Sequence, residues 1–181
     1  LKGYVPDITR KADFDINLLK NKLYHAKRPV IVAGSAIRSA GVYQEFFSFA
    51  RRLKIPVLAA NGCNDIFPVQ DHQYYGNFGG IGGRAGNFII QNADLILVLG
   101  CRMAFKHIGF QYQSFSVNSY KIVVDVEEQE LEKATLKIDM PVCMDLKDFL
   151  GECEKESLEC REILPAWKHY CDELRETFPI Y

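Results

Sequence analysis

The chain has 181 residues, which is enough for one domain with a substantial buried core. Its 22 basic and 23 acidic residues nearly cancel and form no Lys/Arg cluster, so the composition argues against nucleic-acid binding. The apolar runs are far shorter than the ~20 residues of a membrane-spanning helix, and the N-terminus shows no signal-peptide pattern, so we expect no membrane segment.

Six cysteines are spread along the chain, and none forms a C-x-x-C pair. Most of them fall in segments whose pattern is typical of a strand or a helix. A zinc site or a disulfide framework is therefore not expected. We predict free thiols in a reducing, cytoplasmic environment.

The N-terminal part predicts a linker, a helix and a strand. Residues 1–13 carry mixed polar residues without periodicity, which predicts a linker from a preceding domain. Asp15 can cap a helix that runs to about Ala26. The apolar run at 30–33 then predicts a short buried strand, and Gly34 ends it.

The middle of the chain repeats this alternation with a long connection inside it. The apolar spacing of residues 42–53 predicts a helix, and residues 55–60 predict the second strand. The connection 61–86 contains a cluster of glycines, and connections of this length in compact domains are commonly functional. A short helix follows, and the unbroken apolar run at 95–99 predicts the third strand.

A second long connection, residues 101–119, leads to a strand at 120–126. A short acidic helix at 127–133 and a fifth strand at 137–143, interrupted by Pro141, come next.

The C-terminal part is predicted to be helical. Asp145 can cap a helix from Leu146 to about Glu162, and Pro165 begins another. Strands that alternate with helices of this length predict a parallel sheet of about six strands with helices on both faces, an α/β, Rossmann-like fold.

The glycine-rich loop is the strongest functional signal. Its glycines are Gly76, Gly79, Gly80, Gly82, Gly83 and Gly86. A glycine-rich loop before a helix and a buried strand is the arrangement with which α/β proteins offer backbone N–H groups to an anion. The loop therefore indicates a nucleotide or a cofactor diphosphate, and the alternative is a tight turn without a ligand. It is not the dinucleotide fingerprint, which directly follows a strand.

Further candidate residues lie at or just after the ends of predicted strands, where open parallel sheets bind ligands. They are Gly34 and Ser35, Gly100 and Arg102, and Asp125. Arg102 can pair with a phosphate as a bidentate fork, and the alternative is a surface salt bridge. Asp125 can accept hydrogen bonds from a ribose hydroxyl, and the alternative is a helix cap.

Catalytic patterns are missing from the sequence. His72 and His107 fall in predicted loops without a nearby nucleophile or metal partner, and neither G-x-S-x-G nor a P-loop occurs. Cys101 follows a strand without a paired histidine, which is typical of a core residue. We expect neither a catalytic nor a metal-binding residue in this chain.

The order of the motifs resembles the central domain of thiamine-diphosphate-dependent enzymes, especially the large catalytic subunit of acetolactate synthases. The segments that carry the resemblance are RPVIVAGS (28–35), LKIPVL (53–58), FPxxDH (67–72), the glycine-rich loop, ADLILVLGCR (93–102) and KIVVDVE (121–127). The resemblance predicts a central domain over residues 14–152. Residues 153–181 resemble that family's helical linker towards a third domain.

This resemblance implies that the chain is part of a longer protein with N- and C-terminal domains as its partners. The first domain would supply the catalytic glutamate, and the third would hold thiamine diphosphate through Mg²⁺, so this chain would bind neither. The parent, a transferase or lyase, would decarboxylate a 2-oxo acid and join the carbanion to a second carbonyl, and it would be a homo-oligomer. We expect no turnover by the chain alone.

The resemblance also implies a ligand for this domain, because acetolactate synthases bind FAD there in a structural role, and other relatives bind ADP or a CoA moiety. The implied contact residues are Gly34, Ser35, Gly79, Gly80, Gly82, Gly83, Gly100, Arg102, Asp125 and Glu127. The chain departs from the FAD-binding pattern after Gly100, where the paired Asp residues are absent and Lys106 replaces the second Arg. A spacer domain of a related decarboxylase or synthase, without a nucleotide, is the alternative. A free-standing dehydrogenase is disfavoured because the glycine fingerprint does not follow the first strand.

Overall fold

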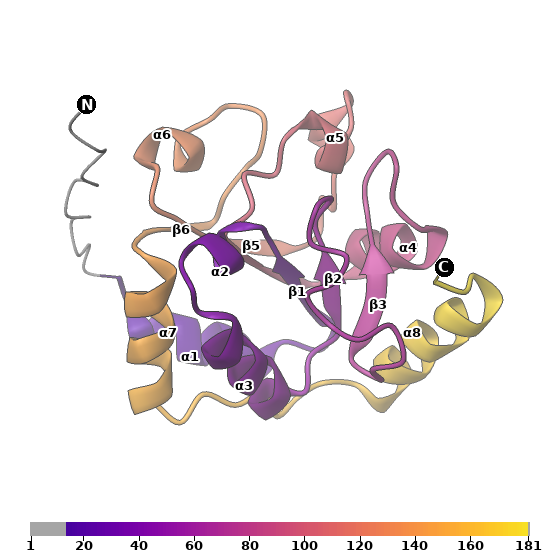
Figure 1. The fold of residues 1–181 in the computed structure, drawn as a ribbon, viewed down its shortest axis with the longest axis horizontal. Coiled ribbons are helices and arrows are strands. Elements are labelled where there is room, and N and C mark those ends of the chain that lie inside the picture. Colours follow the sequence, from indigo (N-terminus) through magenta and orange to yellow (C-terminus); the bar gives the residue numbers. More distant parts are fainter. Residues whose placement is uncertain (1–13, 181) are drawn as a thin grey trace.

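The computed structural model describes residues 14–180, and its central layer is a parallel six-stranded sheet (Figure 1). The strands are β1 (Pro29–Ala33), β2 (Val57–Ala59), β3 (Tyr74–Asn77), β4 (Leu95–Leu99), β5 (Tyr120–Asp125) and β6 (Met140–Cys143). Their order in the sheet is β3-β2-β1-β4-β5-β6, and every neighbouring pair is parallel. This is the order of an open, doubly wound Rossmann-type sheet, so the predicted fold class is confirmed.

Helices cover both faces of the sheet. In chain order the helices of the described residues are α1 (Ile16–His25), α2 (Ala36–Ser39), α3 (Tyr43–Leu53), α4 (Arg84–Asn92), α5 (Phe105–Ile108), α6 (Glu128–Leu131), α7 (Leu146–Lys155) and α8 (Pro165–Thr177). A 3-10 turn at Tyr112–Ser114 follows α5. The short helices α5 and α6 lie beyond the carboxyl ends of β4 and β5, at the top of Figure 1.

The central strand β1 shows why these strands are continuous apolar runs. Ile31 pairs with Val57 of β2 on one side and with Leu97 of β4 on the other. Its side chain belongs to the core on one face, whereas Val30 and Val32 belong to the core on the opposite face. A strand that is buried on both faces must be apolar at every position.

The helices α1, α3 and α7 cover the first face (Figure 1). Helix α1 begins where the Asp15 side chain accepts a hydrogen bond from the Leu18 amide at 2.9 Å, as the sequence predicts. Leu19 of α1, Phe46 of α3 and Phe149 of α7 are fully buried in this layer. Burial of each such side chain stabilises the fold by about 1.5–3 kcal/mol.

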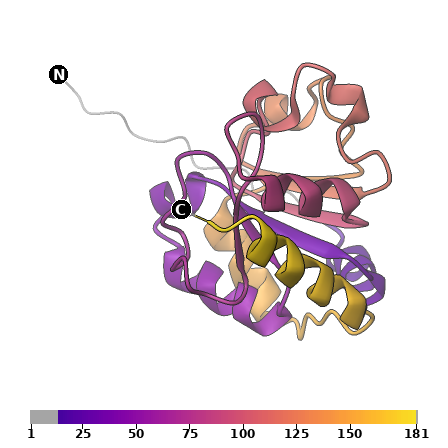
Figure 2. The same ribbon diagram turned by 90° about the vertical axis from the view of Figure 1, so that its right-hand side faces the viewer.

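The second face is covered by α4 and α8, which lie side by side in Figure 2. Ile89 of α4 packs in this layer with Trp167 and Cys171 of α8. The Trp167 indole N–H donates a hydrogen bond to the Pro29 carbonyl oxygen at 3.0 Å, so α8 is bonded to the start of β1.

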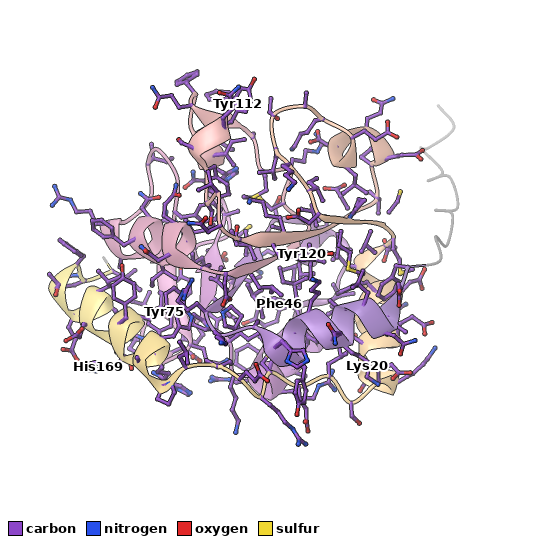
Figure 3. All side chains as sticks on the ribbon, turned by 180° about the vertical axis from the view of Figure 1, so that it is seen from behind. Lys20, Phe46, Tyr75, Tyr112, Tyr120 and His169 are labelled. Atoms are coloured by element: carbon purple, nitrogen blue, oxygen red, sulfur yellow. The ribbon has the colours of Figure 1, made fainter. Side chains whose placement is uncertain are left out.

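Helix α8 also holds the edge strand β3. The buried Tyr75 hydroxyl donates to Asp172 Oδ1 at 2.7 Å, and Arg175 donates to the Tyr74 carbonyl oxygen at 3.2 Å. Figure 3 shows Tyr75 within the molecule and Tyr112 at its upper margin. Helix α8 thus packs on this domain, and its role as a linker to a further domain stays a prediction. The linker predicted at residues 1–13 lies outside the described residues.

Some predicted boundaries were wrong. Strand β3 was missed because Tyr74–Asn77 has neither a long apolar run nor alternation, and its Gly76 has φ +82°. The short helices α2 and α5 were missed inside predicted loops for a similar reason. Strands β2 and β6 are shorter than predicted, and Pro141 is accommodated because β6 is an edge strand.

Helix α7 ends at Lys155, whereas the sequence predicted an end near Glu162. The following segment makes hydrogen bonds to the end of α1 and the residues after it. The Glu162 amide donates to the Tyr24 carbonyl oxygen at 3.2 Å, and the Leu164 amide donates to the Lys27 carbonyl oxygen at 2.9 Å. These tertiary bonds hold the segment outside the helix.

All six cysteines are free, and four of them are buried, Cys101 included. Among residues 14–180, no helix has both the length and the apolar character that a membrane crossing requires.

Candidate functional site

A cavity of about 470 Å³ lies at the carboxyl ends of β1, β2, β4 and β5. Its polar lining includes Ser35, Ser39, Asn61, Arg102, Lys106, His107, Asp125 and Glu127, with Gly100 in its wall. Strand order reverses between β1 and β4, and open α/β sheets bind ligands at such a point. Five of the ten predicted contact residues meet here: Ser35, Gly100, Arg102, Asp125 and Glu127.

Gly34 and Gly100 bring the ends of β1 and β4 together beneath this cavity. The Gly34 amide donates to the Leu99 carbonyl oxygen at 2.9 Å, and the Ala36 amide donates to Gly100 at 3.2 Å. A β-carbon on Gly34 would lie 1.9 Å from the Gly100 carbonyl oxygen. Glycine at 34 is therefore required by the close approach of two backbones.

The glycine-rich loop does not line the cavity, and its amides are bonded within the protein. The Gly79 amide donates to Asn87 Oδ1 and the Gly80 amide to the Lys106 carbonyl oxygen, both at 2.8 Å. The amides of Gly82 and Gly83 donate to the carbonyl oxygens of Gly79 and Asn77. The expectation that these amides are free for an anion is therefore wrong. A contact of the four glycines with a cofactor stays a prediction.

What the loop does instead is support α5. A β-carbon on Gly79, which has φ +99°, would lie 2.4 Å from the Lys106 carbonyl oxygen and 2.9 Å from His107 Cα. The loop backbone thus packs directly on the backbone of α5 and fixes Lys106 and His107 against the cavity.

Two basic side chains stand at the cavity. Lys106 is exposed. Arg102 is 67% exposed, and its Nε lies 3.7 Å from Glu130 Oε1. The alternative of a surface salt bridge is therefore present, but the contact is long and leaves the rest of the guanidinium facing solvent.

The carboxylate side of the cavity comes from the end of β5. Asp125 is partly buried, and its Oδ1 accepts a hydrogen bond from the Glu127 amide at 3.0 Å. Burial raises the pKa of the Asp125 carboxyl above its ordinary value. The N-cap of α6 is Glu127, so the alternative that Asp125 caps this helix is wrong. Its role as a ribose acceptor stays a prediction.

His107 is a residue that the sequence prediction set aside as a loop histidine. It lies in α5 and is only 7% exposed. Its Nε2 accepts a hydrogen bond from the backbone N–H of Asn61, at 3.4 Å. Its ring centroid lies 5.5 Å from the ring centroid of Phe78. Burial and, after it, the charges of Lys106 and Lys133 lower the pKa of His107 to about 4.

Within residues 14–180, two buried side-chain polar atoms have no hydrogen-bond partner: His107 Nδ1 and Asn61 Nδ2. Both residues line this cavity. The signal that was available in the sequence is their place in the connections that follow β2 and β4, on the edge where ligands were expected.

A second hollow, of about 380 Å³, lies beside Arg28, Asn92 and Trp167. Several of its polar groups are already bonded: Arg28 Nε donates to the Asn92 carbonyl oxygen, and Asn92 Nδ2 donates to the Tyr170 hydroxyl. The cavity at the strand ends is the better candidate because the two residues with unpaired polar atoms line it. In the described part of the chain, no three His, Cys, Asp or Glu residues are grouped as a metal site.

Residues 16–153 match one family model, which is described as "Thiamine pyrophosphate enzyme, central domain". Three curated relatives illustrate the range of similar proteins. A probable acetolactate synthase large subunit of Methanococcus aeolicus is 30% identical over 135 residues, which is 72% of this chain and 22% of that protein. The acetolactate synthase of Mycobacterium leprae is 26% identical over 99% of this chain and 29% of its own length.

The third relative, a sulfoacetaldehyde acetyltransferase of Castellaniella defragrans, is 30% identical over 74% of this chain and 22% of its own length. The chain thus spans less than a third of the length of each of these relatives.

Proposed function

Because the chain belongs to the central-domain family of thiamine pyrophosphate enzymes, we propose that it is the central domain of a longer acetolactate-synthase-like enzyme and binds a nucleotide of the FAD or ADP type. The observation that carries the ligand proposal is the cavity at the strand ends. It combines exposed basic side chains, two carboxylates and two buried donors without partners.

The lining fits the parts of a nucleotide. Arg102 and Lys106 supply positive charge for a diphosphate, and Asp125 and Glu127 supply acceptors for ribose hydroxyls. Gly34 and Gly100 hold the two strand ends together below them. Gly79 and Gly80 contribute by supporting α5, and Gly82 and Gly83 contribute through bonds within the loop and to Asn77.

The proposed parent decarboxylates a 2-oxo acid and joins the product to a second carbonyl compound. Thiamine diphosphate supplies the stabilisation of the carbanion for this chemistry, and we propose that Mg²⁺ and domains on either side of this chain hold it. In this proposal residues 153–181 lead to the third domain, and the parent is a cytoplasmic homo-oligomer. The central domain walls the active-site channel and is stabilised by its own nucleotide.

A second candidate function is a spacer domain without a nucleotide. The observation that favours it is the glycine-rich loop, in which the amides of Gly79, Gly80, Gly82 and Gly83 are all bonded within the protein. A loop of this kind needs no ligand to be satisfied.

Titration of the 181-residue chain with FAD and with ADP separates the two functions. A nucleotide site predicts that the melting temperature rises with ligand concentration and that Arg102→Ala weakens the effect. Arg161→Ala is the matched control, because Arg161 is exposed and lies outside the cavity. No rise with either ligand would favour the spacer.

A further inference from the structure

We propose that His107 and Asn61 form an oxyanion-binding pair in which His107 Nδ1–H and Asn61 Nδ2–H donate hydrogen bonds to phosphate oxygens of a nucleoside phosphate. This inference rests on the proposed nucleotide site and names the residues that select its ligand. In this proposal, the phosphate is recognised by α5 and the segment after β2, and not by the glycine-rich loop.

The first step is the location of the two unpaired atoms. An unpaired buried donor costs about 1–3 kcal/mol, so native structures contain few of them. Among residues 14–180, the two atoms of this kind belong to side chains that line the same cavity. Both also come from the carboxyl ends of strands, Asn61 after β2 and His107 after β4.

The second step is that both atoms are donors. The backbone N–H of Asn61 donates to His107 Nε2, so a neutral ring carries its hydrogen on Nδ1. Asn61 Oδ1 accepts from Asn77 Nδ2 at 3.4 Å, which leaves Asn61 Nδ2 as the free end of the carboxamide. A second proton on the ring would face the Asn61 N–H, so the ring is held as a neutral donor. Neither donor meets an acceptor within residues 14–180.

The third step is the charge around the pair. Lys106 and Arg102 line the same cavity, and their positive charge favours an anionic acceptor over a neutral one. Phosphate oxygens accept hydrogen bonds and carry that negative charge. The carboxylates of Asp125 and Glu127 repel a phosphate and accept hydrogen bonds from hydroxyl groups, so they favour the sugar end of the ligand. The phosphate thus points to α5 and the sugar to the end of β5.

The test compares ADP with adenosine, which lacks the phosphates, by calorimetric titration of the 181-residue chain. His107→Phe keeps a ring beside Phe78 and removes the donor, and Asn61→Asp replaces the amide donor by an acceptor. The matched control is His72→Phe, because His72 is exposed and does not line the cavity. We expect each cavity variant to raise the Kd for ADP at least ~10-fold and to leave the weaker binding of adenosine unchanged.

The outcomes are separable. ADP binding that is unchanged in both cavity variants but weakened in Arg102→Ala overturns the oxyanion pair and leaves the nucleotide site standing. Equal losses for ADP and adenosine also overturn the pair, because they indicate a general disturbance of the cavity. Absence of ADP and FAD binding to the unmodified chain overturns the nucleotide site and the pair together.

A second measurement does not depend on the folding of a variant. Ring-nitrogen NMR of the unmodified chain reports the tautomer of His107 and the environment of Nδ1–H. The proposal predicts a neutral ring with hydrogen on Nδ1, whose resonance shifts on addition of ADP and stays in place on addition of adenosine. An Nδ1 resonance that does not respond to bound ADP would contradict it.

Discussion

The backbone amide of Gly80 donates a hydrogen bond to the carbonyl oxygen of Lys106, 2.8 Å away. One residue earlier, Gly79 approaches the same oxygen so closely that no side chain fits between them. The glycine-rich loop is thus a support for α5, and α5 carries His107 into the cavity. The glycines thus position α5, whereas the polar side chains that line the cavity come from other residues.

Gly79→Ala is expected to destabilise the domain by about 2–4 kcal/mol, because it adds the strain of a left-handed residue to a backbone clash. Gly62→Ala is the matched control, since Gly62 has φ +94° and nothing within 4 Å of an added β-carbon. It should cost only the strain, about 1–2 kcal/mol. Urea unfolding measures both values, and equal losses would show that the contact with α5 is unimportant.

Gly34→Ala and Gly151→Ala are expected to change stability in opposite directions. The first places a β-carbon 1.9 Å from the Gly100 carbonyl oxygen and should cost more than ~3 kcal/mol or prevent folding. The second lies within α7 with open space around it and should stabilise by about 0.5–1 kcal/mol. Thermal unfolding gives the sign of each effect. A tolerated alanine at 34 would contradict the close crossing of the strand ends.

Because of His107, the free energy of unfolding of the domain should decrease as the pH is lowered. Burial, followed by Lys106 and Lys133, lowers the pKa of this ring from 6.5 to about 4, so the folded protein resists protonation. Below pH 6.5 the unfolded chain takes up the proton first, and stability is lost progressively as the pH falls towards 4. Between pH 7 and pH 4.5 this histidine should cost about 2 kcal/mol.

The difference between the unmodified chain and His107→Phe isolates this effect, because contributions that the two proteins share cancel in the comparison. Denaturant unfolding at the two pH values should show a loss in the unmodified chain that exceeds the loss in the variant. Equal losses would mean that His107 is not held neutral by its surroundings.

Tyr75→Phe tests the attachment of α8 to the sheet. It removes the 2.7 Å bond from the buried hydroxyl to Asp172 Oδ1 and should cost about 1–2 kcal/mol. Tyr112→Phe, at the partly exposed margin in Figure 3, should change stability by less than ~0.5 kcal/mol. Urea unfolding compares the two. A Tyr75 variant as stable as the Tyr112 variant would indicate that α8 is only loosely attached.

The parts of the fold that the sequence predicted are those whose residues carry their own signal. The apolar runs of β1, β4 and β5 are buried on both faces, and Asp15 and Asp145 cap the helices that follow them. Strand β3 has no such signal, because it forms only through pairing with β2 and the contacts of α8. The end of α7 was also set by distant hydrogen bonds, to residues 24 and 27.

The candidate site was half predictable for a similar reason. Arg102 lies shortly after β4 and Asp125 ends β5, so the rule for parallel sheets predicted their place at this edge of the sheet. The pairing of His107 with Asn61 joins residues 46 positions apart through a hydrogen bond that no local pattern encodes. The bonding of the glycine amides within the protein was not predictable, because a run of glycines does not show which group its amides will bond.

Amide NMR mapping of the 181-residue chain during titration with ADP tests the central claim most directly, since it locates the ligand. The proposed site predicts saturable shifts centred on Gly100, Arg102, His107 and Asp125, while the indole N–H of Trp167 beside the second hollow stays in place. Shifts centred on Trp167, or no saturable shift at the strand ends, would contradict a nucleotide site in this domain.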